Sequence, residues 1–221
     1  GPDAEWTEHT INATTGRGFD VELADMNGDG RLDILYGNHN HQGSTVPAEQ
    51  TMGVYWFEIP PADELDGDDV ALIPAFGTTL QIEESLQQSG IDTSTEEYRE
   101  NYDTTCPFVS KVWKRGEELG REGYTIIIHG KYKHEETQAT HSHTMQHAKT
   151  LVVLDRDEAH KVAAFITGDM ALADFECAFA GKSSVGFEPA RDLERVAVVN
   201  QTTMLAEETQ EVTRILREAM R

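Results

Sequence analysis

The sequence predicts an α/β fold, because buried strands and amphipathic helices alternate along most of the chain. Short apolar runs at residues 124–129, 151–155 and 195–200 are bounded by polar segments, which is typical of strands buried on both faces. Residues 157–167 and 205–220 place apolar residues at helical spacing. This alternation favours parallel sheets, in which ligands bind beyond the carboxyl ends of the strands.

The composition limits the possible partners of the chain. Its 221 residues contain no run of roughly 20 apolar residues, so no membrane span is predicted. The net charge of −22 disfavours nucleic acid and anionic membranes as partners. The chain begins Gly1-Pro2 rather than with Met, and we therefore expect a fragment, a processed product or a tag remnant.

The first third of the chain is more acidic than the rest. Residues 1–70 hold 15 acidic residues against two arginines. Together with the pair Pro60-Pro61, this change in composition predicts a boundary near residues 60–70. The predicted domains are residues 1–62, 63–147 and 148–221.

Residues 25–33 read DMNGDGRLD and suggest a calcium loop. Calcium takes six to eight oxygen ligands, and a tight loop with glycines can fold several of them around one ion. The spacing matches the first half of an EF-hand loop, but Tyr36 stands where that loop has a Glu. Alternating apolar residues on both sides predict strand, loop, strand instead. The alternative is an acidic turn without metal. The oxygen-bearing side chains are Asp25, Asn27, Asp29 and Asp33.

The next elements follow in order from residue 69. Residues 69–76, DVALIPAF, predict a buried parallel strand. Thr78 or Thr79 is expected to cap a helix that ends near Gly90. A further strand is predicted to give way to a helix at Cys106, with Pro107 in the first helical turn and with Thr104 or Thr105 as the cap.

Cys106 is one of two cysteines, the other being Cys177, so a disulfide framework is not predicted and a reducing interior is expected. At the start of a helix, unpaired N–H groups and the helix dipole favour the thiolate, which binds metals and attacks electrophiles. The alternative is a small buried apolar side chain.

Two further strand ends carry reactive side chains. His134 and Glu136 follow the strand at 124–129, and Thr202 and Thr203 follow the strand at 195–200. His134 could bind an anion or transfer a proton, because its unperturbed pKa is about 6.5. Glu136 could deliver a proton if burial raised its pKa. As alternatives, His134 is a surface loop residue, Glu136 belongs to the acidic start of a helix, and Thr202 is only an N-cap.

Residues 18–38, GFDVELADMNGDGRLDILYGN, resemble an FG-GAP (VCBS-type) repeat, the blade unit of calcium-binding β-propellers on secreted and surface proteins. The resemblance covers about residues 5–59 and implies a small β segment like one propeller blade. It implies calcium ligation by the oxygen-bearing side chains named above and by the carbonyl of Arg31. One blade cannot form a propeller, since each blade needs neighbours.

The segments IPAFGTTLQIEESLQQSGID, YDTTCPFVSKVWKRGEELG, YTIIIHGKYKHEETQATHS and VVNQTTMLAEETQ resemble 4-hydroxy-3-methylbut-2-enyl diphosphate reductase of the plant and cyanobacterial type. The resemblance covers about residues 66–221. It implies the middle lobe and most of the third lobe of a three-lobed α/β enzyme. That enzyme holds a 4Fe–4S cluster on one cysteine from each lobe and converts its substrate to isopentenyl and dimethylallyl diphosphates.

The same resemblance implies roles for individual residues. Cys106 would be the cluster ligand of the middle lobe, His134 would lie beside the substrate, Glu136 would relay the proton, and Thr202 would hold the substrate hydroxyl. The implied partners are a diphosphate substrate and an electron donor of ferredoxin or flavodoxin type, in the cytoplasm.

The chain also departs from that family. The first lobe and the third cysteine ligand are not found, and Cys177 is interpreted as a structural or incidental thiol. We therefore expect this chain to be inactive on its own. The alternative is a non-catalytic chimeric fragment with a calcium-binding module. The loop with His141, His143 and His147 is interpreted as a solvated linker, with a zinc or nickel site as the alternative.

Overall fold

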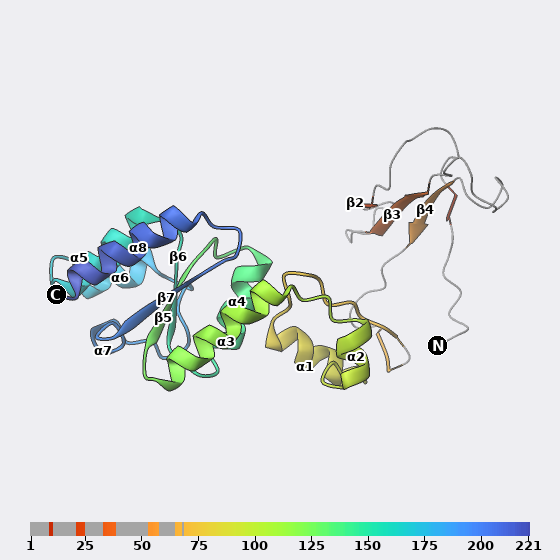
Figure 1. Cartoon of the computed structure of the whole chain (residues 1–221), viewed down its shortest axis with the longest axis horizontal. Coiled ribbons are helices and arrows are strands. Elements are labelled where there is room, and N and C mark those ends of the chain that lie inside the picture. The colour runs from red at the N-terminus through yellow and green to blue at the C-terminus, as the bar shows by residue number, and fades with distance from the viewer. Residues whose placement is uncertain (1–8, 11–20, 25–32, 39–52, 58–64, 68) are drawn as a thin grey trace. The chain divides into compact units, whose positions relative to one another are not determined.

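The computed structural model describes residues 65–67 and 69–221 in full and the backbone of residues 9–10, 21–24, 33–38 and 53–57 (Figure 1). The chain divides into two compact units, Gly1–Asp69 and Val70–Arg221. The predicted boundary lay close by, between residues 62 and 63.

The first unit contains an antiparallel sheet of four described strands. Their order is β1-β4-β3-β2, and Ala24 at the end of β2 pairs with Asp33 at the start of β3. This pairing agrees with the strand–loop–strand pattern. Asp25, Asn27, Asp29 and Arg31 lie outside the described residues, and Asp33 is described in its backbone alone, so calcium binding stays a prediction. The strands are β1 (His9–Thr10), β2 (Val21–Ala24), β3 (Asp33–Asn38) and β4 (Gly53–Phe57).

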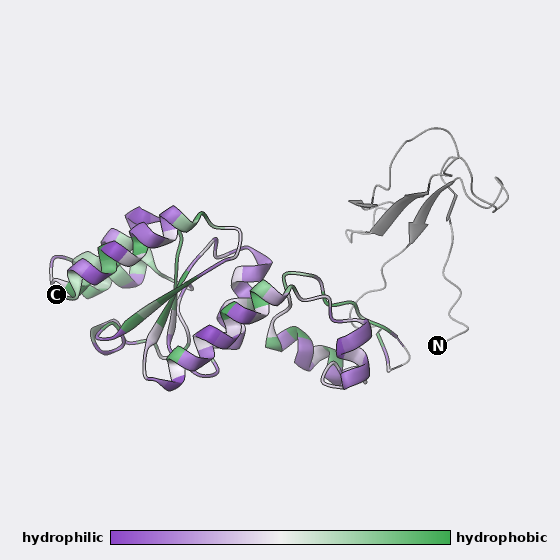
Figure 2. Ribbon diagram, viewed as in Figure 1, coloured by the Kyte–Doolittle hydropathy of each residue, from purple (hydrophilic) through white to green (hydrophobic). Residues whose placement is uncertain are grey.

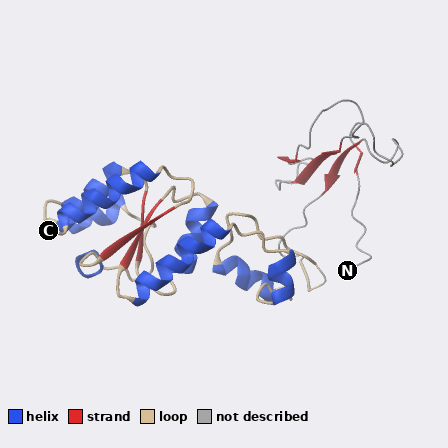
Figure 3. Cartoon of the chain, viewed as in Figure 1, coloured by secondary structure: helices blue, strands red, loops and turns tan. Residues whose placement is uncertain are grey.

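The second unit is built on a parallel sheet of three strands, in the order β6-β5-β7 (Figure 3). The three predicted strands are confirmed as β5 (Thr125–His129), β6 (Thr150–Val153) and β7 (Val196–Asn200). They come from both segments that were expected to form separate lobes. The predicted boundary between residues 147 and 148 therefore crosses a single sheet.

Helices cover both faces of this sheet. Helices α3 and α4 pack on one face, while α5, α6 and α8 pack on the other (Figure 1). The helices of the second unit are α1 (Leu80–Gln88), α2 (Glu96–Asn101), α3 (Pro107–Arg121), α4 (Glu135–Thr144), α5 (Arg156–Ile166), α6 (Leu172–Ala178), α7 (Pro189–Asp192) and α8 (Ala206–Ala219). Among the described residues, no helix has the length and apolar character needed to cross a bilayer.

The central strand shows how the two faces are filled. Ile127 points into the core beneath α5 and α8, whereas Ile126 and Ile128 point into the core beneath α3. All three are fully buried, as the twofold alternation of a strand between two helical layers requires. The strands are largely hydrophobic in Figure 2.

The segment before α1 differs from its prediction. Residues 69–76 do not form a buried strand: Ile73 makes one isolated parallel bridge to Asp103, while Val70 and Leu72 are 59% and 64% exposed. Pro74 supplies no N–H to extend a ladder. Thr79 caps α1, as predicted.

The start of α3 also differs from its prediction. Cys106 itself occupies the N-cap position, and no side chain caps the helix. The Thr104 hydroxyl donates instead to the carbonyl of Ile73, at 2.7 Å.

Candidate active site

The candidate site lies where β5 and β7 end. The chain leaves β5 towards α4 on one face of the sheet and leaves β7 towards α8 on the other face. Adjacent parallel strands whose connections part in this way leave a crevice at their carboxyl ends, and this is where open α/β sheets bind ligands.

Glu136 and Thr202 meet where these two strands end. The Thr202 backbone N–H donates to Oε1 of Glu136 at 2.5 Å, and the Thr202 hydroxyl donates to Oε2 at 3.0 Å. The Glu136 residue is only 3% exposed, whereas Thr202 is exposed. The structure thus brings two predicted site residues together, with a buried carboxylate behind an accessible hydroxyl.

His134 is the N-cap of α4, and its Nδ1 accepts the backbone N–H of Glu136 at 3.2 Å. Because Nδ1 is an acceptor, the proton of the neutral ring lies on Nε2. The ring therefore offers one donor at the same helix terminus as Glu136. N–H groups and the positive end of a helix dipole favour anions at such a terminus.

Gln201 connects the ends of β5 and β7 through hydrogen bonds. It was not among the residues predicted from the sequence. Its Oε1 accepts from the Lys131 backbone N–H and the Thr137 hydroxyl, both at 3.1 Å, and its Nε2 donates to the Thr203 hydroxyl at 2.7 Å. A Cβ on Gly130 would lie 2.7 Å from the Thr137 hydroxyl oxygen. Glycine at that position therefore permits the close approach.

The packing of α3 on α4 places Cys106 at the same end as His134 and Glu136. The Trp113 Nε1–H donates to the Thr140 hydroxyl at 3.1 Å. Farther along, Gly116 faces Thr144, and Gly120 faces Ala148. The two helices therefore run parallel with a constant offset, so the N-terminus of α3 lies beside the N-terminus of α4. Cys106 is partly buried there.

The segment before α1 is fixed to this helix pair. Ala75 accepts the Cys106 backbone N–H at 2.8 Å. Gly77, with φ of +75°, lies against the Trp113 ring, where a Cβ would come within 2.4 Å of the ring carbons. The carbonyl of Thr78 accepts from Nε2 of His143 at 3.0 Å.

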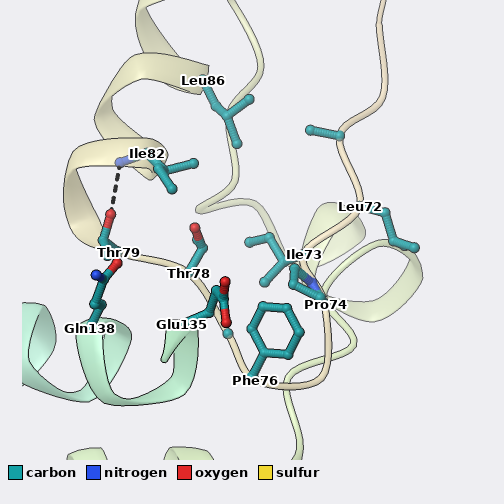
Figure 4. A pocket seen from close by; sticks show the side chains of 12 residues that line it. Leu72, Ile73, Pro74, Phe76, Thr78, Thr79, Ile82, Leu86, Glu135 and Gln138 are labelled. Carbon is teal, nitrogen blue, oxygen red and sulfur yellow. Dashed lines mark hydrogen bonds between the residues drawn. The ribbon is translucent and has the colours of Figure 1, made fainter. Parts of the chain in front are cut away.

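An apolar pocket of about 320 Å³ separates this segment from the first turn of α4 (Figure 4). Phe76 and Ile82 form part of its wall on one side, and Glu135 and Gln138 of α4 close the other. Phe76 supplies an aromatic ring to this wall. The Phe76 ring lies next to Glu135, which directly precedes Glu136 in the chain (Figure 4).

The histidine-rich segment was interpreted as a solvated linker, and this interpretation was wrong for two of its three residues. His141 and His143 belong to α4, and His143 stacks on Trp113 with a ring distance of 3.9 Å. Burial lowers the pKa of both histidines. His147 follows the helix and lies 3.5 Å from Glu117.

The described residues do not assemble a metal centre on their own. No three of their His, Cys, Asp or Glu side chains are grouped to hold an ion. Cys177 is exposed on α6, which packs beneath the face opposite α3, so it lies apart from Cys106. Cys106 can supply one thiolate, and the two cysteines of the chain cannot together form a cluster site.

The fold and the candidate site define the class of protein: a parallel α/β protein in which a buried carboxylate and an exposed hydroxyl meet where two adjacent strands end. Within that class, the chain belongs to the LytB protein family, whose model matches residues 23–221. The match begins within the segment that was expected to be an FG-GAP-type repeat.

Named relatives cover part of the chain. The chain is 47% identical over 152 residues to "4-hydroxy-3-methylbut-2-enyl diphosphate reductase" of Synechococcus sp. (strain CC9605). This alignment covers 69% of this chain and 35% of the Synechococcus protein. The protein of that name from Nostoc punctiforme (strain ATCC 29133 / PCC 73102) is 44% identical with the same coverage. The chain thus spans about a third of the length of these relatives.

Solved structures of similarly named proteins align over 72% of the chain. One, of the E-1-hydroxy-2-methyl-but-2-enyl-4-diphosphate reductase from Plasmodium falciparum, is 19% identical with a TM-score of 0.49 and is covered over 39% of its length. Another, of (E)-4-hydroxy-3-methyl-but-2-enyl diphosphate reductase, is 25% identical with a TM-score of 0.48 and is covered over 44% of its length.

Proposed function

We propose that this chain carries part of the active site of a 4-hydroxy-3-methylbut-2-enyl diphosphate reductase. The proposal is supported by the family membership and by the names of the relatives. The observation that carries it is the buried Glu136 carboxylate held by Thr202 at the end of β7. A reductive dehydroxylation needs a proton at the departing hydroxyl, and a carboxyl group behind an accessible hydroxyl is suited to deliver one.

Each of the three residues takes a role that its geometry allows. Thr202 would hold the substrate hydroxyl through its Oγ1, which already hydrogen-bonds to Glu136. Protonated Glu136 would donate its proton to Oγ1 of Thr202 while that hydroxyl donates its own proton to the substrate hydroxyl, which leaves as water. His134 would donate from Nε2 to a diphosphate oxygen, since Nδ1 is occupied by the N–H of Glu136.

Cys106 is proposed as a ligand of an iron–sulfur cluster, which would supply the electrons. A thiolate at a helix N-terminus suits this ligation. The residues of this chain do not fit a complete cluster, because a three-cysteine set would need two more thiolates at the site. No reaction step is therefore assigned to the cluster, and a ferredoxin-type or flavodoxin-type donor stays a prediction.

A segment exchange tests the proposal. The matched segment of this chain would replace the aligned segment of the Synechococcus relative, and reductase turnover would be measured with reconstituted protein. We expect the exchanged enzyme to retain turnover, and Glu136→Gln within it to lower kcat by about 10²- to 10⁴-fold, the usual contribution of a general acid. Lys114→Gln, an exposed substitution on α3, is the control. Full activity in Glu136→Gln would overturn the proposal.

A calcium-binding module in the first unit is the second candidate. It is favoured by the antiparallel pairing of β2 with β3 on either side of the acidic loop. If the loop binds calcium, the ion stabilises the folded state by mass action, and the melting temperature rises with calcium concentration. The effect should vanish in Asp25→Ala and persist in Asp3→Ala. Equal melting with calcium and with a chelator would remove this candidate.

A further inference from the structure

A second pocket, of about 420 Å³, opens at the carboxyl ends of β5 and β6. Its walls come from the loop after β5, the end of β6, the first turn of α5 and Lys182. Gln201, Glu136 and Thr202 are not among its lining residues. The loop of residues 130–133 therefore has two contacts: the Lys131 backbone N–H donates to Gln201, and the loop residues line this pocket.

The floor of the pocket is apolar. Val152 belongs to the core beneath α3, and Tyr132 packs against the same core. Leu154 is 40% exposed, a high value for a leucine that directly follows a buried strand. A hydrocarbon group here would cover the exposed surface of Leu154.

Three lysines surround this floor in a chain that is otherwise strongly acidic: Lys131, Lys133 and Lys182. Lys182 is neutralised, because its ammonium group contacts Oε1 of Glu158 at 2.6 Å. The other oxygen of Glu158 accepts the Leu154 backbone N–H at 2.8 Å.

Lys131 and Lys133 differ from Lys182. Both are exposed, and neither ammonium group forms a hydrogen bond or ion pair with any residue in the described part of the chain. Both oxygens of Glu158 already have other partners. Two lysines without an ionic partner among the described residues therefore belong to the lining of this apolar pocket, and lysine is a regular partner of phosphate groups.

We propose that this pocket binds a phosphate monoester with a short hydrocarbon part. The phosphate dianion would bind the ammonium groups of Lys131 and Lys133, and the hydrocarbon would rest on Leu154. The site is separate from the candidate active site and does not depend on the reductase proposal. Occupancy would hold the loop that Gln201 ties to the end of β7.

Calorimetric titration of the full chain with n-pentyl phosphate tests this site, with inorganic phosphate and n-pentanol as partial ligands. We expect n-pentyl phosphate to bind at least about tenfold more tightly than either, since one lacks the apolar contact and the other lacks the charge. Lys131→Gln combined with Lys133→Gln should weaken binding by roughly tenfold or more, because charge-assisted hydrogen bonds are lost. Both side chains are exposed, so the fold should persist.

Two control variants distinguish binding in this pocket from a general charge effect and from binding at the candidate active site. Lys114→Gln combined with Lys161→Gln changes the net charge equally but touches neither pocket, and binding should change less than about twofold. His134→Gln alters the residue proposed to bind a diphosphate oxygen at the candidate active site and should leave n-pentyl phosphate binding unchanged. Unchanged affinity in the Lys131/Lys133 variant would overturn the proposal. So would an equal loss in the Lys114/Lys161 variant, or an affinity for inorganic phosphate equal to that for n-pentyl phosphate.

Discussion

Helices α4 and α8 belong to opposite faces of the same sheet, yet they bury different chemistry. Helix α8 buries Val212, Ile215 and Leu216 against an apolar core. Helix α4 buries one carboxylate and four hydroxyl side chains. The first helix stabilises the sheet through hydrophobic burial, whereas the second holds polar groups at positions fixed by hydrogen bonds. The buried polar residues of α4 are Glu136, Thr137, Thr140, Ser142 and Thr144.

This contrast predicts different effects for substitutions on the two faces. Apolar side chains pack wherever their volume fits, but buried polar groups are costly unless they are hydrogen-bonded. Most of the polar groups of α4 have partners that define the site: Thr202, Gln201, Trp113 and Leu80. Substitutions on α8 should therefore change stability most, and substitutions around α4 should change stability less but function more.

The largest loss of stability is expected for Leu216→Ala. The side chain is 1% exposed in the α5/α8 core, and its truncation leaves a cavity. The free energy of unfolding should fall by about 2–5 kcal/mol in urea titrations. Leu205→Ala, at a 65% exposed position just before α8, should change it by less than about 0.5 kcal/mol. Equal effects at the two positions would contradict the assigned core.

Gln201→Ala should have an intermediate effect. It leaves the Lys131 N–H and the Thr137 hydroxyl without their acceptor, and an unsatisfied buried group costs about 1–3 kcal/mol. The same urea titrations would measure the change. The matched substitution Gln138→Ala, on the exposed side of α4, should change stability little. A neutral Gln201→Ala would show that the strand ends are not held by this side chain.

The smallest effect concerns pH. Burial lowers the pKa of His129, His141 and His143, so the unfolded chain binds protons more readily than the folded chain. Their stabilisation is present above the unfolded value of about 6.5 and is lost as pH falls through the lower folded values. Thermal unfolding at about pH 7.5 and 5.5 should show lower stability at the acidic value. His143→Gln should reduce this difference, and an unchanged or larger difference would contradict the burial of His143.

The same contrast explains which features the sequence predicted. Strands β5 to β7 and helices α5 and α8 followed from apolar runs and helical spacing. Helix α4 did not, because threonines and a glutamate occupy its buried positions and leave no apolar period. Residues 69–76 have the composition of a strand, but only Ile73 found a partner.

The site residues that could be predicted from the sequence are those that directly follow predicted strands. Topology places the ends of β5 and β7 side by side, so the meeting of Glu136 with Thr202 was anticipated. Gln201 was not singled out, since a glutamine has no reactive chemistry and its role depends on three partners from distant segments. The stacking of Trp113 on His143 was not predicted either, because it depends on how two helices from separate segments pack.

The central claim is that Glu136 and Thr202 act as one proton-delivering unit. A double-mutant cycle of Glu136→Gln and Thr202→Val in the exchanged Synechococcus enzyme, read out as kcat, tests it most directly. Residues that act as a unit give non-additive losses. We predict that the double variant turns over no more slowly than the slower single variant, whereas losses that multiply would contradict the claim.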